Sequence, residues 1–539
     1  MANVSPEPVL LDDEQMRQFI ANGYVVLRPS VPDSVHQVID AKFDFVHEYE
    51  FNPGNNILPR IPELELILQS PEVRGALISV LGENYITHPH RFWHMRPAAE
   101  QRVEAREVEE AVSRDCHQDA YSPSTQPRSH RTRYARIMYY SQDTPIEMGP
   151  THVLAGTQYH DVLTDEDRAR TLPVDGRAGL VFLSHFDIGH AAGVNLQDRS
   201  RHMIKFIFMR AEEPGEPTWE CKHARWQAPK KLTAPYNLEP AWRSIWNWHC
   251  GGTAAVGSGL EDQPRVAHLI ETLESDASIE DKLEAMGQLA DGGSAAESAV
   301  PALTATLSTG HQAVRTGAIY TLAAIGEPAV ETLCDLLDQA GERVSRGEET
   351  PKFDERWITL HAAAYALAAI GAPALEPLQQ LLNSPHEWTR MNAAFALGEM
   401  DSDAAAAVPA LEAVLQDVSH YVIRIAANSL GAIQQGVAGE VLGQLVSAVR
   451  PEWIEAKKWG WTVNNAVNVT AAMALTRLGC RAATAEEALI RALRDSFDQA
   501  GFFAVQALDR IGTDTARRAV IDDLISRRWD TDLNRQRKY

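Results

Sequence analysis

The stretch GLVFLSHFDIGHAAGVNLQDRSRHMIKFIFMR, residues 179–210, decides the fold of the first part of the chain. It holds two apolar runs, 179–184 and 203–209, separated by turn residues rather than by a helical pattern. Apolar runs of this length between turn residues are typical of strands. Further strands are predicted at 24–28, 86–95, 133–140 and 152–156. Short strands that follow one another in this way favour an antiparallel barrel or jelly roll.

The composition is that of an ordinary globular protein, with 45% hydrophobic and 23% charged residues over 539 positions. The net charge of −23 argues against a nucleic-acid partner, because phosphate binding needs clustered positive charge. It also argues against binding to anionic membranes, and no apolar run reaches the roughly 18 residues of a membrane span. Five scattered cysteines and an acidic N-terminus without a signal-peptide pattern predict a cytoplasmic location.

A second architecture begins beyond a stretch rich in Gly, Ala and Ser at 251–262, which is predicted to be a linker. Helical segments built around small residues recur after it and end at 326, 371, 401, 434, 479 and 512. Amphipathic segments such as 300–308 and 375–383 precede them. A repeat of this size made of two helices is typical of an α-solenoid. The units resemble short HEAT repeats, with Val314–Arg315 opening a second helix.

The pair His117 and Asp119 is the candidate for metal chemistry. On a strand, residues at this spacing point to the same face. An imidazole and a carboxylate, joined by a second histidine, form a facial triad that leaves open positions on iron(II). His190 is the leading candidate for that histidine. A second pair, His185 and Asp187, is assigned a structural role, because the histidines that follow it are too close in the chain to return across a barrel.

Arg201 stands at the start of the strongly apolar strand 203–209. An arginine inside the mouth of a barrel needs an anionic partner, and a carboxylate that accepts two hydrogen bonds is the natural one. A metal triad beside such an arginine suits a 2-oxo acid that chelates iron at one end and pairs with the guanidinium at the other.

The chain resembles the phytanoyl-CoA dioxygenase family of iron(II)/2-oxoglutarate oxygenases. The stretches that carry this resemblance are LDDEQMRQFIANGYVVLRPSVP (11–32), HQDAYSP (117–123), EMGPTHVLAGTQ (147–158) and HAAGVNLQDRSR (190–201). The resemblance implies a double-stranded β-helix (jelly roll) with Fe(II) on His117, Asp119 and His190. It further implies that Arg201 binds the distal carboxylate of 2-oxoglutarate and that Asn195 belongs to the co-substrate site.

Substrate contacts are expected from the strand 86–95 and from the loop after the metal motif. The candidates are His90, Trp93, Tyr121 and Arg136. The expected reaction is hydroxylation of an unactivated C–H bond in a small-molecule or carrier-bound substrate, with O2 consumed and succinate and CO2 released. The alternative is an interaction scaffold, in which HEAT repeats bind a protein and the oxygenase-like domain is not catalytic. The charged segment 97–115 is either a solvated helix or a lid.

The chain is therefore predicted to be a multidomain α+β protein. Its expected parts are an oxygenase domain at 1–250, a linker at 251–262, a HEAT-repeat α-solenoid at 263–530 and a basic tail at 531–539. The two folded parts are expected to be separable, because each repeat of a solenoid packs mainly on its neighbours.

Overall fold

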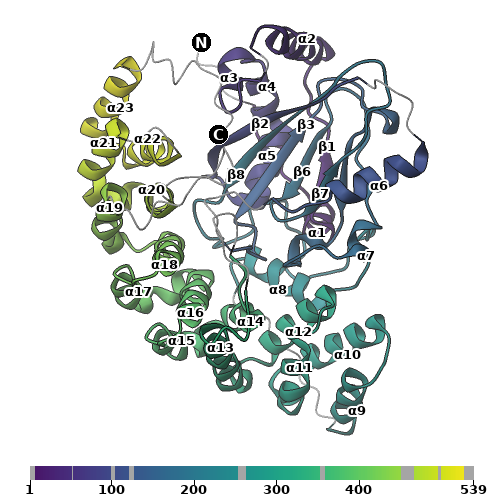
Figure 1. Cartoon of the computed structure of the whole chain (residues 1–539), viewed down its shortest axis with the longest axis vertical. Coiled ribbons are helices and arrows are strands. Elements are labelled where there is room, and N and C mark those ends of the chain that lie inside the picture. Colours follow the sequence, from purple (N-terminus) through teal and green to yellow (C-terminus); the bar gives the residue numbers. More distant parts are fainter. Residues whose placement is uncertain are drawn as a thin grey trace.

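A computed structural model describes residues 6–50, 52–98, 104–119, 127–252, 263–351, 358–448, 450, 466–495 and 499–526. A β-sheet domain comes first, and an arc of helices follows it and curves around one side of the sheets (Figure 1). Among the described residues, none of the helices combines the length and the apolar character needed to cross a membrane.

The first domain is built on two antiparallel sheets. The larger has the order β1 (Tyr24–Leu27), β6 (Val181–His185), β3 (Tyr134–Tyr139), β8 (Arg201–Met209) and β2 (Ile86–Arg96). The smaller has the order β5 (Leu172–Pro173), β4 (Thr151–Leu154) and β7 (Gly189–Ala192). The strands expected from the sequence are therefore present, and β5 and β7 are additional. His190 lies on β7, which was not predicted because turn residues follow it closely in the sequence.

Apolar side chains from both sheets meet between the two layers. Met138 and Phe182 of the larger sheet pack with Val153 of the smaller one in a single buried cluster. Buried side chains of the two facing sheets thus pack against each other as two layers. The predicted architecture, a two-sheet antiparallel domain followed by a helical repeat region, is confirmed.

Helices cover the outer face of the larger sheet. They include α1 (Asp13–Asn22), α2 (Asp33–Glu50), α3 (Ile57–Arg60), α4 (Leu64–Leu68) and α5 (Pro71–Leu81). Asp12 and Gln15 form a capping box that starts α1, and Gly23 ends it with a φ of +84° that favours glycine. The strand predicted at 24–28 follows directly as β1. Phe43 of α2 stacks on Trp93 of β2, with ring centroids 4.9 Å apart.

The remaining helices belong to two groups. The first group lies within or just after the sheet domain and comprises α6 (Ala105–Asp115), α7 (Asp165–Arg168) and α8 (Glu239–His249). The arc comprises α9 (Gln263–Glu274), α10 (Ile279–Gly292), α11 (Val300–Thr306), α12 (Gln312–Ile325), α13 (Val330–Ser345), α14 (Ala362–Ile370), α15 (Leu375–Leu381), α16 (Glu387–Glu399), α17 (Val408–Val414), α18 (His420–Ile433), α19 (Gly439–Ser447), α20 (Ala466–Leu478), α21 (Glu486–Asp495), α22 (Gln499–Ile511) and α23 (Asp514–Ser526).

Small residues explain why neighbouring repeats of the arc stack so closely. Ala393, Ala426 and Ala472 on successive second helices are completely buried. A Cβ atom added to Gly431 would lie 2.8 Å from the Cα atom of Ala474, so a larger residue would force α18 away from α20. The small residues of the repeat pattern therefore set the spacing of the solenoid.

The second helices of the repeats face the sheet domain (Figure 1). Polar contacts across the interface join Tyr320 to His130, Tyr365 to Arg128, Arg477 to Tyr134 and Gln506 to Thr87. These contacts come from α12, α14, α20 and α22 in turn. The concave side of the solenoid is thus occupied by the chain's own β-sheet domain.

A buried charged cluster lies at the centre of this interface. Arg133 bonds to Glu399 at 3.1 Å and to Asp401 at 2.6 Å. Asp401 also accepts from Arg131 and from the Trp248 indole, both at 2.9 Å. Removing one partner of a buried ion pair leaves the other charge uncompensated, which is strongly destabilising. The interface therefore argues against the expected independence of the two parts.

His130 makes the interface sensitive to pH. Its ring stacks on Tyr365, with centroids 4.4 Å apart, and burial lowers its pKa to about 3. An unfolded histidine has a pKa near 6.5, so the unfolded chain binds a proton that the folded chain excludes. This contribution to stability is present above pH 6.5 and is lost as the pH falls toward 3. From pH 7 to pH 5, His130 is expected to cost about 2 kcal/mol.

The His130→Gln variant tests this expectation. The free energy of unfolding, measured with denaturant at pH 7 and pH 5, should fall less steeply with acid in the variant than in the parent protein. His268→Gln is the matched control, because that side chain is mostly exposed on α9. Equal acid sensitivity of the parent and the His130→Gln variant would contradict the prediction.

Candidate metal and co-substrate site

His117 and His190 are held side by side by the backbone. Each residue donates its amide to the carbonyl of the other at 2.9 Å, in an isolated antiparallel bridge. The two imidazole rings consequently lie with centroids 4.4 Å apart. His117 and Asp119 do not lie on a regular strand, as the sequence analysis had assumed. The bridge to β7, rather than a strand of their own, orients the motif.

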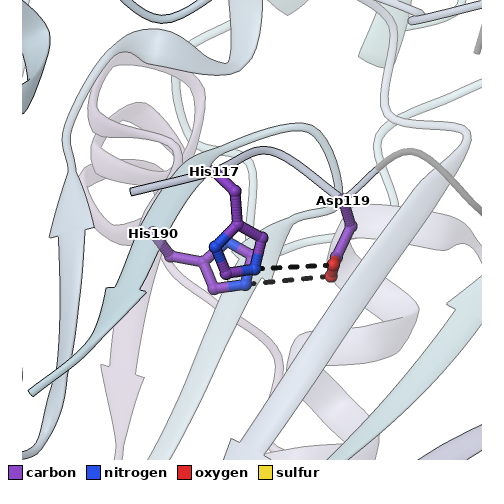
Figure 2. A group of neighbouring side chains, drawn as sticks. All are labelled: His117, Asp119 and His190. Carbon is purple, nitrogen blue, oxygen red and sulfur yellow. Dashed lines mark ion pairs between the residues drawn. The ribbon is translucent and has the colours of Figure 1, made fainter. Parts of the chain in front are cut away.

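The three predicted ligands converge on one point, and Figure 2 shows both imidazoles directed at the Asp119 carboxylate. The Nε2 atoms of His117 and His190 lie 3.9 and 3.8 Å from oxygens of Asp119. Each Nδ1 atom faces a backbone carbonyl, that of Asp115 at 2.6 Å and that of Ile188 at 3.2 Å. These bonds fix the ring orientation and leave both Nε2 atoms for a metal.

The protonation states suit a metal site. Burial and then Arg136 hold the pKa of His190 well below its usual value, so the imidazole is neutral. Burial alone would raise the pKa of Asp119, but Lys205 and Arg136 hold it well below its usual range. A neutral imidazole and an ionised carboxylate are the forms that bind a metal ion. All three ligand atoms lie within 4.8 Å of one another, so the group fits a single ion.

Two cations contact the carboxylate of Asp119. Arg136 of β3 donates to it, and Lys205 of β8 lies 3.1 Å from the same oxygen. Nη1 of Arg136 is also 3.3 Å from Nε2 of His190, so a metal ion there would leave the guanidinium its bonds to Asp119 and to the Phe186 carbonyl. Arg136 was a candidate from the sequence, whereas Lys205 was missed. The available signal was its position four residues after Arg201, on the same face of the strand.

Arg201 is completely buried at the start of β8. Within the described part of the chain, none of its three guanidinium nitrogens makes a well-formed hydrogen bond. The ring centroid of Tyr140 lies 5.9 Å from its guanidinium carbon. Burial lowers the pKa of Arg201, which reflects the cost of an uncompensated charge. A carboxylate placed against this guanidinium would remove that cost, as a 2-oxo acid requires.

Gln118, which lies between the two ligands, is a functional residue that the sequence analysis overlooked. Its side-chain amide donates to the carbonyls of Thr157, His160 and Asp187 at 2.9–3.1 Å. One amide therefore ties the metal motif to two neighbouring loops. The sequence did contain one signal for this role. Gln118 lies between two predicted ligands that share a face, so its own side chain is expected to point away from the metal and into the protein.

Two predicted site residues lie elsewhere. Trp93 is on the opposite face of β2, where it packs on Phe43 of α2 and on the His202 ring 5.4 Å away. The side-chain amide of Asn195 donates to Pro97 and Arg199 carbonyls and accepts from a backbone amide, so it builds the turn before β8. Neither side chain is available to a ligand in this arrangement. Tyr121 lies outside the described residues.

His90 and the second His-x-Asp pair have distinct positions. The His90 ring lies parallel to the Phe92 ring, with centroids 6.4 Å apart, and Phe92 is the cross-strand partner of Lys205. His185 accepts a bond from the Asp187 amide at 3.1 Å, and Asp187 pairs with Arg128 at 3.2 Å. Burial raises the pKa of Asp187 to about 6. The pair therefore supports the loop behind the triad, as expected.

The segment 97–115 is partly described. Residues 99–103 fall outside the described chain, and α6 occupies Ala105–Asp115. Val112 and Cys116 pack against Leu154 and Ala191 of the smaller sheet. The C-terminal end of α6 is thereby anchored on β4 and β7.

Two family models match separate parts of the chain. The phytanoyl-CoA dioxygenase family model matches residues 19–203, and the HEAT-repeat model matches 266–349 and 352–445. A search of curated proteins finds no match. The solved carbocyclase SnoK from nogalamycin biosynthesis, described as non-heme and alpha-ketoglutarate dependent, is 18% identical and covers 38% of this chain and 88% of its own, with a TM-score of 0.30. HygX from Streptomyces hygroscopicus with nickel and 2-oxoglutarate bound is 13% identical and covers 38% and 88%, with a TM-score of 0.28.

The family matches and the His-Asp-His group define an iron(II)/2-oxoglutarate oxygenase. Residues 19–203 belong to the phytanoyl-CoA dioxygenase family, and HEAT repeats follow them at 266–445. The predicted enzyme class is thereby confirmed, as are Fe(II) and 2-oxoglutarate as the cofactor and co-substrate on which the family depends.

Proposed function

We propose that the chain hydroxylates an unactivated C–H bond of a small-molecule or carrier-bound substrate. O2 and 2-oxoglutarate would be consumed, and succinate and CO2 released. The observation that carries this proposal is the convergence of His117, Asp119 and His190 in a domain that also buries an unsatisfied Arg201. Hydroxylation is favoured over halogenation because Asp119 occupies the position that a halide would need.

Each of these residues has a role in the proposed reaction. His117, Asp119 and His190 would hold iron(II), and Arg201 would bind the distal carboxylate of 2-oxoglutarate. Bound iron supplies the activation of O2, which the protein's own side chains cannot provide. Arg136 and Lys205 would keep Asp119 ionised and fix its orientation. Gln118 would hold the two ligands in register through its three carbonyl contacts.

We also propose that residues 1–250 and 263–530 act as one unit. Tyr365 of α14 donates to the Arg128 carbonyl at 2.9 Å, and Arg128 donates to the Asp119 carbonyl at 3.3 Å. The solenoid would thus support the loop that holds a metal ligand. A protein partner would then use surfaces other than the concave side, since the oxygenase domain covers it. All five cysteines are unpaired, which supports a reducing location such as the cytoplasm.

The Arg201→Ala variant tests the co-substrate assignment. Loss of a buried charge-assisted pair costs about 2–5 kcal/mol, so the Michaelis constant for 2-oxoglutarate should rise at least about thirtyfold. Arg201→Lys should recover only part of this loss, because an ammonium cannot form the fork. Succinate release and bound iron are measured in parallel, and iron content should change little.

Arg199→Ala is the matched control, because Arg199 is about half exposed and pairs with Asp40. It should leave the Michaelis constant unchanged. An unchanged constant in Arg201→Ala would place the distal carboxylate elsewhere and remove the main support for the proposed function.

A further inference from the structure

Two buried cations lie next to the candidate metal site. The side chains of Arg136 and Lys205 are 0% and 5% exposed, and both contact one oxygen of Asp119. They come from adjacent strands, β3 and β8, which pair in register across Arg136 and Ile207. One carboxylate thus faces two positive charges, and it is also the residue that would bind the metal.

The inference that follows rests on the proposed function. Iron(II) brings two positive charges, and 2-oxoglutarate brings two negative ones. One carboxylate of 2-oxoglutarate would pair with Arg201, while the other and Asp119 would compensate the metal. Arg136 and Lys205, whose side chains are buried, then keep a positive charge of two. Buried charge of this size is costly unless a counter-charge accompanies it.

The opposite wall of the site is aromatic. A register shift between Thr87 and Arg91 turns Phe92 toward Lys205, its direct partner on β8. The His90 ring lies parallel to the Phe92 ring, and the His94 ring meets Phe92 edge-on at 4.9 Å. Burial and then Lys205 hold the pKa values of His90 and His94 well below their usual range, so both rings are neutral.

His94 adds an unused polar atom to this wall. Its Nε2 atom is buried, and no described residue forms a hydrogen bond with it. His117, by contrast, has a side chain that is 49% exposed, so the site opens to solvent on that side. The site therefore combines one solvent-exposed imidazole, an aromatic wall and an excess of positive charge.

We propose that the primary substrate is an organic acid whose carboxylate or phosphate group binds Lys205, with Arg136 behind it. The apolar part of the substrate would lie against Phe92, and the hydrogen-bonding capacity of His94 would be used by a polar group of the bound molecule. The anionic group would complete the charge balance that Asp119 and 2-oxoglutarate leave open.

The test uses the full chain loaded with nickel(II) and 2-oxoglutarate, so that binding is measured without turnover. Calorimetry compares hexanoate with hexanamide, and hexyl phosphate with hexanol. The acid of at least one pair should bind about tenfold more tightly than its neutral partner. The pair with the larger difference shows whether the site prefers a carboxylate or a phosphate group. Lys205→Met should remove this preference, whereas Lys205→Arg should keep most of it.

Two further measurements separate the possible outcomes. Arg199→Met removes an exposed cation close in sequence to β8 and should leave the preference intact. Lys205→Met should change the dissociation constant of 2-oxoglutarate by a smaller factor than it changes the ratio of the dissociation constants of the neutral and acidic analogues. Equal binding of acids and neutral analogues, or no binding of either, overturns the inference. A larger effect of Lys205→Met on 2-oxoglutarate than on the acids also overturns it. Failure of 2-oxoglutarate to bind the parent protein overturns the proposed function itself.

Discussion

Asp119→Ala is expected to abolish iron binding and the turnover of 2-oxoglutarate. The substitution removes the carboxylate of the triad and leaves Arg136 and Lys205 beside the two imidazoles. A site with two imidazoles, no carboxylate and two adjacent cations would repel a metal ion. Removing the shared partner of two buried cations should also cost about 3–5 kcal/mol of stability. Iron content, succinate release and the free energy of unfolding are the three measurements.

His117→Ala and His190→Ala should lose iron as well, but without the large loss of stability. His185→Ala is the control, because His185 bonds to the Asp187 amide and is not directed at the triad. It should retain iron. Iron retained in Asp119→Ala, or lost in His185→Ala with His117→Ala unaffected, would contradict the assignment.

A chain that ends at residue 252 is expected to lose both solubility and metal affinity. The cut would leave Arg133 without Glu399 and Asp401 and would expose the surface on which the second helices pack. It would also remove the Tyr365 bond to Arg128, whose side chain donates to the Asp119 carbonyl. Aggregation is measured by light scattering, and metal affinity by competition with a chelator. A soluble fragment with the metal affinity of the full chain would show that the solenoid has no role at the site.

Asp401→Asn is the milder form of the same experiment. Asp401 has a φ of +57°, a conformation that Asn tolerates, so the change affects mainly the charge. The loss of its pairs with Arg131 and Arg133 should cost about 3 kcal/mol and weaken metal binding. Asp417→Asn is the matched control, because Asp417 pairs with Arg390 inside the solenoid. It should lower stability without changing metal affinity.

The sequence was sufficient to predict the metal group, because metal chemistry restricts the residue types. His117 and Asp119 were identified by their spacing, and His190 and Arg201 by their positions relative to apolar strands. The start and end of α1 were predictable for a similar reason, since Asp12 and Gly23 act on residues near them in the chain.

Other features depend on contacts that local patterns do not encode. The register shift between Thr87 and Arg91 decides which side of β2 faces the site, and it places Trp93 outside. Asn195 is used by the turn in which it lies. The docking of the solenoid rests on contacts such as Arg133 to Asp401, which are 268 residues apart. The strand pattern of the first part and the helical repeat of the second can each be recognised without the other. Neither pattern therefore reveals that the two parts share a buried charged cluster.

The most direct test of the central claim is a crystal structure of the full chain with nickel(II) and 2-oxoglutarate. Anomalous scattering locates the metal independently of any assumption about its ligands. The account predicts nickel on the Nε2 atoms of His117 and His190 and on the Asp119 carboxylate, with the distal carboxylate of 2-oxoglutarate on Arg201. Nickel bound away from this group, or 2-oxoglutarate bound without contact to Arg201, would contradict it.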